Sequence, residues 1–338
     1  MAEMLPFCNN GTLEITPGKE EPDWHVYIGV GYLGLFSMVI VPQVFVFFTA
    51  IKKQLRVYSC YKLMLAICLL DSFNLVDCLL IPAIFSLWNI DHCNSGMWVI
   101  QYGTVAAFVW WFYCMLNLVL AANRLAEFSS QRLAEFFFSG RRTWFWLVVP
   151  TLYASLMLWF ARNPFYMYSP NAGIWFFFWN NDGDLTNYEH IYNNSMKLIL
   201  VTLMYVVMII LLRRKMREAS SSVSDMEKRF SIQVFLISVM CAAANITYVV
   251  ISYSSLNQWD GAGVIANLLW AALHGTNVLK TDAKIVLLAC SGFVYLALNR
   301  SVQETVRNCV CWKQKPNVSV VSVQYHVPLV GASSGSMH

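Results

Sequence analysis

The stretch "WVIQYGTVAAFVWWFYCMLNLVLAANR", residues 98–124, decides the fold because it carries no charged side chain before Arg124. A helix of about 20 mostly apolar residues is long enough to cross the hydrocarbon core of a bilayer. The sequence therefore predicts a spanning helix over residues 98–123. Five further mostly apolar runs lie at residues 26–51, 63–88, 144–162, 196–212 and 230–252.

The composition also predicts a membrane protein. Apolar residues make up 58% of the 338 residues and charged residues only 12%, about half the charged share of a soluble domain. The net charge is +4 and the bases stand in short clusters, which argues against nucleic-acid binding. Residues 1–25 are polar and acidic and lack the regions of a signal peptide, so we expect the first apolar run to act as the insertion signal.

The number of spans depends on residues 262–300. This region holds two short apolar pieces separated by a polar piece that contains Lys280, Asp282 and Lys284. Hydropathy alone allows six, seven or eight spans in the chain.

The distribution of basic residues narrows the number of possible spans. Loops 52–62, 124–143 and 213–229 carry four, four and six bases, whereas the segments that alternate with them carry only Lys19. Short cytoplasmic loops collect Lys and Arg, and the tail after residue 299 is also basic. The sequence therefore predicts an all-α, seven-transmembrane helix bundle with the N-terminus outside and the C-terminus in the cytoplasm.

This topology divides the chain into an extracellular N-terminus, residues 1–25, a bundle, residues 26–300, and a cytoplasmic tail, residues 301–338. Cys8 and Cys93 are the two cysteines expected outside, where they either form a disulfide or remain two thiols.

Several modification sites follow from the same topology. Asn10 begins a glycosylation sequon outside, and Asn193 begins another that is close to the membrane. In the tail, Cys309 and Cys311 follow a segment that can form an amphipathic helix, so they are candidates for palmitoylation.

Polar residues inside spans are costly and therefore point to function. Asp71 lies in the middle of its span with Asn74 one turn away, and Asn245 lies in the run 230–252. We predict that these three form an interior polar switch; the alternative for Asp71 is a neutral buried carboxyl satisfied by its neighbours. Asp77 points in another direction, and Pro82 is expected to kink the helix and release backbone carbonyls from helical hydrogen bonds.

Helical phase joins Arg124 to the outer half of its span. Counted back from Arg124 at about 100° per residue, Asn117, Tyr113 and Trp110 all fall within about 40° of Arg124 on the helix. If Arg124 instead extended toward lipid headgroups, Asn117 would face hydrocarbon, so the inward orientation is favoured. Trp110, Tyr113 and Asn117 are then candidates for a ligand pocket.

The segment 163–195 is rich in aromatic residues and includes Trp175. It either contributes residues to an interfacial aromatic belt or folds over the mouth of the bundle as a lid, which would add Trp175 to the pocket.

The sequence lacks the motifs of several other classes. Its six histidines are isolated, and no hydrolase, zinc or phosphate-loop motif occurs, so we predict no enzyme, no metal and no cofactor. No internal repeat indicates a transporter, and no filter loop indicates a channel. A receptor that shifts between two packings is the class that remains; the alternative is a seven-span transporter or scaffold without signalling.

A set of motifs, in order, resembles the nematode serpentine chemoreceptors, most closely class T (Srt), over most of residues 26–300. The motifs are "SCYKLM", "LLDSFNL", "LAANR", "SGRRTWFWLVVP", "LHG" and "FVYLALNRSV". The resemblance implies a rhodopsin-like G-protein-coupled receptor for environmental chemicals, in the plasma membrane of sensory neurons and their cilia. Its partners would be a heterotrimeric G protein, a small-molecule or peptide ligand, and membrane lipid.

The resemblance also implies a coupling site at the cytoplasmic face. Its residues would be Asn123, Arg124, Arg213, Lys228 and Arg300, although attraction to anionic lipid is an alternative role for the bases. Asn123 stands where such receptors carry an acidic residue, and it can supply only a neutral hydrogen bond. Another contact must therefore hold Arg124. The usual disulfide to the second outer loop cannot form, since 163–195 contains no cysteine.

Residues 276–292 interrupt the last span when compared with the class T pattern. We interpret them as an apparent insertion, either a true part of the receptor or a splicing artefact. With the insertion present, the seventh helix is expected at 285–299, and residues 262–275 are expected to be pushed toward the outer surface as an extra or re-entrant helix.

Overall fold

The computed structural model describes residues 8–9, 12–13, 23–52, 59–160, 164–179, 188–218, 246, 250 and 261–275. Within this part of the chain, five helical segments are long and apolar enough to cross a membrane: Trp24–Ala50, Ser59–Leu87, Trp98–Ser129, Arg142–Phe160 and Ile191–Leu211. The prediction of a mostly helical membrane protein is confirmed. The predicted span 230–252, except for Ile246 and Val250, and residues 276–300 lie outside the described residues.

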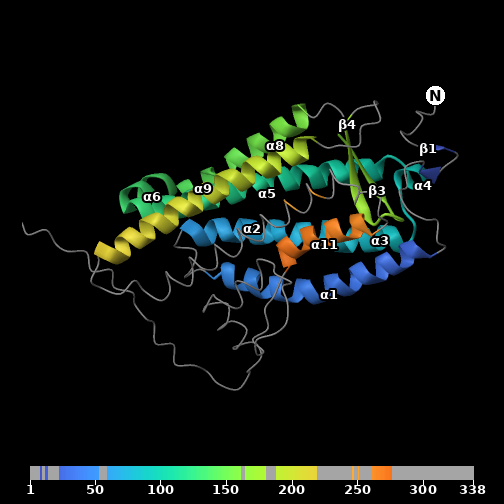
Figure 1. Cartoon of the computed structure of the whole chain (residues 1–338), viewed down its shortest axis with the longest axis horizontal. Coiled ribbons are helices and arrows are strands. Elements are labelled where there is room, and N and C mark those ends of the chain that lie inside the picture. Colours follow the sequence, from blue (N-terminus) through green and yellow to red (C-terminus); the bar gives the residue numbers. More distant parts are fainter. Residues whose placement is uncertain are drawn as a thin grey trace, which may run out of the picture.

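The helices lie side by side in an elongated bundle (Figure 1). Its elements are α1 (Trp24–Ala50), α2 (Ser59–Leu75), the π-helix η2 (Val76–Leu80), α3 (Ile81–Leu87), α5 (Trp98–Ser129), α6 (Gln131–Phe138), α7 (Arg142–Phe145), α8 (Val148–Phe160) and α9 (Tyr188–Glu218). The helix α5 contacts α2, α8 and α9. It therefore joins α8 and α9 to α2.

Two helices are longer than the hydropathy pattern predicts. The helix α5 continues to Ser129, beyond Arg124, and α9 begins at Tyr188 instead of residue 196. Both extensions carry polar side chains that lie against other helices, including Glu127 in α5 and Asn193 in α9. Hydropathy marks only the segment that can face lipid, so it does not detect a polar turn that the protein itself covers.

The segment predicted as an apolar outer loop forms a β-hairpin, which departs from a purely helical fold. Strand β3 (Pro164–Ser169) pairs antiparallel with β4 (Ile174–Trp179), with Tyr166 opposite Phe177. Gly173 ends the turn at a φ of 65°, a conformation that glycine adopts without steric cost. The hairpin packs against one end of the bundle, here called the hairpin end (Figure 1).

Buried tyrosines attach the hairpin to three helices. The Tyr32 hydroxyl of α1 donates a 2.7 Å hydrogen bond to the carbonyl of Gly173. The Tyr168 hydroxyl lies 2.7 Å from Ser86 Oγ in α3, and burial holds the pKa of Tyr168 well above its ordinary value. Tyr166 lies directly against Gly103 of α5. The hairpin therefore covers this end of the bundle as a packed element.

The π-helix and Pro82 together redirect two backbone carbonyls. The Ile81 N–H bonds to the carbonyl of Val76, and Pro82 has no N–H to donate. The carbonyls of Asp77 and Cys78 accept bonds from other elements instead: Trp175 Nε1 donates to Asp77 at 3.3 Å, and Asn267 Nδ2 donates to Cys78 at 2.8 Å. The expected release of carbonyls near Pro82 is confirmed.

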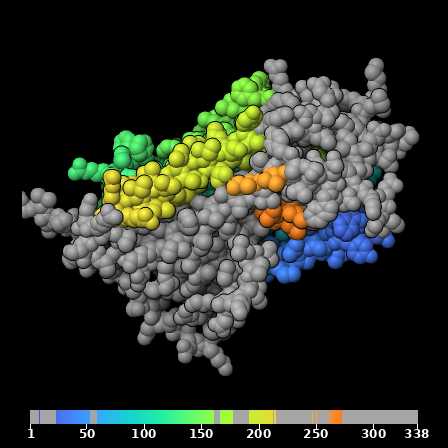
Figure 2. Space-filling model, viewed as in Figure 1, coloured from blue at the N-terminus to red at the C-terminus, as the bar shows by residue number. Residues whose placement is uncertain are grey.

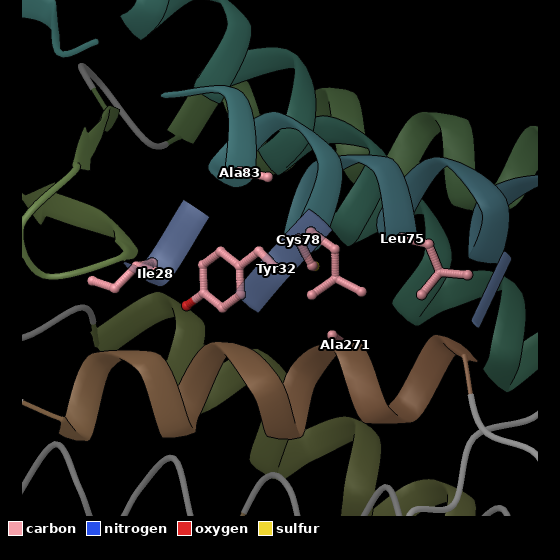
Figure 3. Close-up of a cluster of buried hydrophobic side chains, with 7 residues drawn as sticks. Ile28, Tyr32, Leu75, Cys78, Ala83 and Ala271 are labelled. Carbon is pink, nitrogen blue, oxygen red and sulfur yellow. The ribbon is translucent and has the colours of Figure 1, made fainter. Parts of the chain in front are cut away.

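The helix α11 (Ala262–Gly275) occupies the core of the hairpin half of the bundle. Its Ala271 belongs to a buried cluster on α1, α2, η2 and α3 (Figure 3), formed with Ile28, Tyr32, Leu75, Cys78, Leu79 and Ala83. The expectation that residues 262–275 form an extra or re-entrant helix toward the outer side of the bundle stays a prediction. A small residue permits the close packing of this helix, since Gly263 lets it approach the carbonyl of Ala172, which would lie 2.9 Å from an added Cβ. The apparent insertion, residues 276–292, lies outside the described residues.

Asn267→Ala is expected to destabilise the protein by about 1–3 kcal/mol, since it leaves a buried carbonyl without its amide donor. Asn117→Ala is the matched control, because the Asn117 amide donates at 2.8 Å to Tyr113 of its own helix. We expect the control to cost less, since that carbonyl lies within a regular helix. The midpoint of thermal unfolding in detergent measures both. Equal midpoints for the two variants would contradict the proposed role of Asn267.

Candidate ligand and coupling sites

The aromatic stripe on α5 faces the protein interior. Trp110 and Tyr113 are 6% and 4% exposed, and Arg124 is also buried. Trp110 meets Trp270 of α11 edge to face, with ring centroids 6.2 Å apart. Asn117 is half-buried and uses its amide on its own helix. Of the three predicted pocket residues on α5, Trp110 and Tyr113 thus contact neighbouring helices, while Asn117 has an intrahelical bond.

Trp175, the fourth predicted pocket residue, lies in a different cluster. It packs against Phe85, Tyr102 and Tyr168, with ring centroids 5.8, 5.7 and 5.3 Å from its own. Its indole nitrogen donates to the carbonyl of Asp77. Trp175 therefore holds the hairpin against the bundle and does not join Tyr113.

Sequence reasoning missed the cation that lies beside Tyr113. Lys197 of α9 is 4% exposed, and its Nζ lies 5.2 Å from the centroid of the Tyr113 ring. The same Nζ is 3.6 Å from Cys114 Sγ. A cation above the face of an aromatic ring is attracted by the ring quadrupole. Lys197 therefore connects α9 to the aromatic stripe of α5.

Two asparagines lie on the same face of α9 as Lys197, at the i−4 and i−3 positions. Asn193 and Asn194 are 5% and 2% exposed, and the Tyr153 hydroxyl of α8 donates to Asn193 Oδ1. We call Tyr113, Cys114, Tyr153, Asn193, Asn194 and Lys197 the Lys197 cluster. The burial of Asn193 within a helix also makes its sequon inaccessible in this conformation.

One signal in the sequence pointed to this cluster. The spacing of "NNSMK", residues 193–197, places two amides and an ammonium on one helical face. The predicted span began at residue 196, so the asparagines were assigned to the loop and the lysine to the helix end. The early start of α9 is what brings the three together.

Arg124 belongs to a second polar group, nearer the C-terminal end of α5. Arg124 Nη1 donates to Glu127 Oε2 at 2.7 Å, and the two side chains are 9% and 29% exposed. The Ser59 hydroxyl of α2 donates to Glu127 Oε1 at 2.8 Å, and Asn123 Nδ2 donates to Ser59 Oγ at 3.0 Å. We call Ser59, Asn123, Arg124 and Glu127 the Arg124 network.

The network supplies the contact that the sequence left unidentified. Because α5 continues beyond Arg124, Glu127 stands at the i+3 position on the same helical face. An acidic residue thus lies one turn after the arginine, whereas the sequence comparison looked for one directly before it. Asn123 reaches the network through Ser59 and so ties α5 to α2.

The remaining predicted site residues are placed only in part. Asp71 and Asn74 of α2 are each 2% exposed, so both lie inside the bundle. Arg213 is exposed near the end of α9. The other predicted residues lie outside the described residues: Asn10, Lys228, Asn245, Arg300, Cys309 and Cys311.

Cys8 and Cys93 form a disulfide with their Cα atoms 5.5 Å apart. It joins strand β1 (Cys8–Asn9), which pairs with β2 (Thr12–Leu13), to the short helix α4 (His92–Ser95) just before α5. The side chain of Asp91 caps α4 by accepting bonds from the N–H groups of Cys93 and Asn94. His92 Nε2 lies 3.4 Å from Cys8 Sγ, but sulfurs bonded to each other are not the thiolates that bind metals.

A bundle of membrane-spanning helices, with a buried polar cluster midway along α5 and a buried arginine network nearer the end of that helix, defines a multi-pass membrane protein. The chain belongs to the family of serpentine type 7TM GPCR chemoreceptors Srt, whose model matches residues 8–318. The predicted family is thereby confirmed, and it is a family of chemosensory receptors, not of enzymes. No curated protein matches the chain.

Proposed function

We propose that this chain binds a small molecule or peptide in the outer half of the bundle, the half that carries the hairpin, and signals to a heterotrimeric G protein at the Arg124 end. The observation that carries the proposal is the course of α5, because one continuous helix holds both polar groups. Tyr113 contacts Lys197, and Arg124 lies eleven positions further along, about 16 Å along the helix axis.

A receptor needs two packings of the bundle that its ligand binds with different affinity. A ligand among α5, α8 and α9 would change the contacts of Tyr113, Tyr153 and Lys197. A shift of α5 relative to α2 would then separate the Ser59 hydroxyl from Glu127 and release Arg124. The packing described above, with the Arg124 network closed, is proposed to be the resting one.

The topology proposed for this function places the N-terminus and the hairpin outside the cell and the C-terminal tail in the cytoplasm, with seven spans. The exposed bases Arg213 and Arg214 at the end of α9, together with Lys228 and Arg300, would then line the coupling face. The C-terminal helix of a G-protein α-subunit, with its carboxylates and carbonyls, complements such a face. The proposed location is the plasma membrane, by family resemblance that of sensory cilia.

Arg124→Ala is expected to reduce second-messenger signalling to background while leaving surface expression unchanged, since it removes the cation offered to the G protein. Arg132→Ala is the matched control, because Arg132 is an exposed arginine on the neighbouring helix α6. The measurement is second-messenger output per receptor at the cell surface. Full signalling by Arg124→Ala, or a transport current that the variant retains, would favour a transporter or scaffold instead.

A further inference from the structure

Lys197 places a positive charge inside the membrane-spanning part of α9. A lysine in the interior of a membrane-spanning helix is costly to insert into a bilayer, and such residues commonly mark binding sites or ion pathways. The helix α9, in yellow in Figure 2, exposes an apolar side with Ile199, Leu203, Val206 and Ile210. Lys197 turns instead toward Tyr113 and Cys114 of α5. Its charge is therefore directed into the bundle, away from the lipid.

Hydrogen-bonding groups surround this charge and are not fully used. Within the described part of the chain, both amide atoms of Asn194 are buried without a hydrogen-bond partner, and so is Asn193 Nδ2. Trp111 Nε1 is also buried without a hydrogen-bond partner, and Trp111 packs in one cluster with Cys114 and Tyr153. A buried polar atom without a partner destabilises the packing around it, and a ligand that supplies the partner removes that cost. Three of these four atoms, the Asn193, Asn194 and Trp111 nitrogens, are donors.

We propose that the Lys197 cluster binds a small organic carboxylate. One ligand oxygen accepts from the Lys197 ammonium and the other from the Asn194 amide, which replaces the weak contact of Nζ with Cys114 Sγ by a charge-assisted hydrogen bond. The apolar part of the ligand meets the aromatic rings of Trp110 and Trp270. This inference rests on the proposed receptor function and names the chemical class of its ligand.

The direct test is binding to the purified full-length chain in detergent. The probes are propionate, butyrate, hexanoate, octanoate and benzoate, each compared with its primary amide, which has the same shape and no charge. We expect at least one carboxylate to raise the midpoint of thermal unfolding, since a ligand that binds only the folded state stabilises it. The matching amide is expected to leave the midpoint unchanged.

Variants locate the binding in the Lys197 cluster. Lys197→Met, which keeps length without charge, is expected to raise the carboxylate concentration needed for half the shift by about 10- to 100-fold. Lys197→Arg should retain most of the shift. Met196→Leu is the control, because Met196 is the exposed neighbour on α9. If Lys197→Met is not recovered folded, Asn194→Ala replaces it, with an expected loss of about tenfold.

Two outcomes would overturn the inference: no carboxylate shifts the wild-type midpoint beyond its amide, or the folded Lys197→Met or Asn194→Ala variant keeps the wild-type concentration dependence. The second-messenger assay of Arg124→Ala distinguishes failure of the carboxylate proposal from failure of the proposed receptor function. Loss of signalling in Arg124→Ala together with no carboxylate binding overturns only the ligand class. Carboxylate binding with Arg124→Ala signalling at the wild-type level overturns the receptor function and leaves the binding site standing.

Discussion

Glu127→Gln is expected to raise ligand-independent signalling roughly fivefold to tenfold. The carboxylate of Glu127 accepts from Arg124 of the same helix at 2.7 Å and from Ser59 of α2 at 2.8 Å, so one oxygen holds Arg124 and the other joins α5 to α2. A hydrogen bond to a charged group contributes about 1.5–3 kcal/mol, less where solvent reaches it. If the mutation destabilises the resting packing by about 1–1.4 kcal/mol and leaves the active packing unchanged, the fraction of receptors in the active packing rises roughly fivefold to tenfold.

The measurement is basal second-messenger output, normalised to receptor at the cell surface, with no ligand added. Glu135→Gln is the matched control, because Glu135 lies exposed on α6 and accepts from Gln131 of the same helix. It should leave basal output unchanged. A basal output of Glu127→Gln equal to that of Glu135→Gln would show that the Arg124 network does not hold the resting state.

Gly103→Ala is expected to lower the free energy of unfolding by at least the usual cost of overpacking, about 1–3 kcal/mol. A Cβ at Gly103 would clash with the Tyr166 Cβ and would lie 2.8 Å from the Tyr166 carbonyl oxygen. Both atoms are close to the backbone of β3, so a change of rotamer cannot remove the clash. The hairpin must move away from α5, which loosens its contacts with α1 and α3 as well.

Gly31→Ala is the comparison variant, because the two substitutions are expected to change the thermal midpoint in opposite directions. A Cβ at Gly31 meets nothing within 4 Å, and replacing glycine by alanine inside a helix stabilises it by about 1 kcal/mol. We therefore expect a higher thermal midpoint in detergent for Gly31→Ala and a lower one for Gly103→Ala. If Gly103→Ala were the more stable variant, the close contact between α5 and the hairpin would be refuted.

The spans were the most predictable part of the fold. Apolar runs of sufficient length can satisfy their backbone groups in a bilayer only as helices, so the described spans were placed without knowledge of their neighbours. Their ends were predicted less well. The turn that carries Glu127 and the turn that carries Asn193 are helical because other helices cover them, and a linear scan of hydropathy contains no information about neighbours.

The candidate sites divide in the same way. Helical phase within α5 predicted that Trp110, Tyr113 and Arg124 share one face, since that relation depends on the sequence positions of a single helix. Lys197 and Ser59 were missed, because each meets α5 from another helix. The contacts of Trp175 could not be predicted for the same reason, since the position of the hairpin depends on its contacts with η2, α3 and α5.

The sequence by itself determined that this protein is a membrane-spanning helix bundle of the Srt family. Hydropathy, motif order and helical phase depend only on the order of residues along the chain, so they can be predicted without knowing which helices are neighbours. Only the tertiary structure decided which residue holds Arg124 and which cation lies beside Tyr113. Both contacts join helices that are distant in sequence, and their partners are selected by the packing of side chains in three dimensions. Residues 98–124 are therefore the first part of a longer helix, whose next turn supplies Glu127.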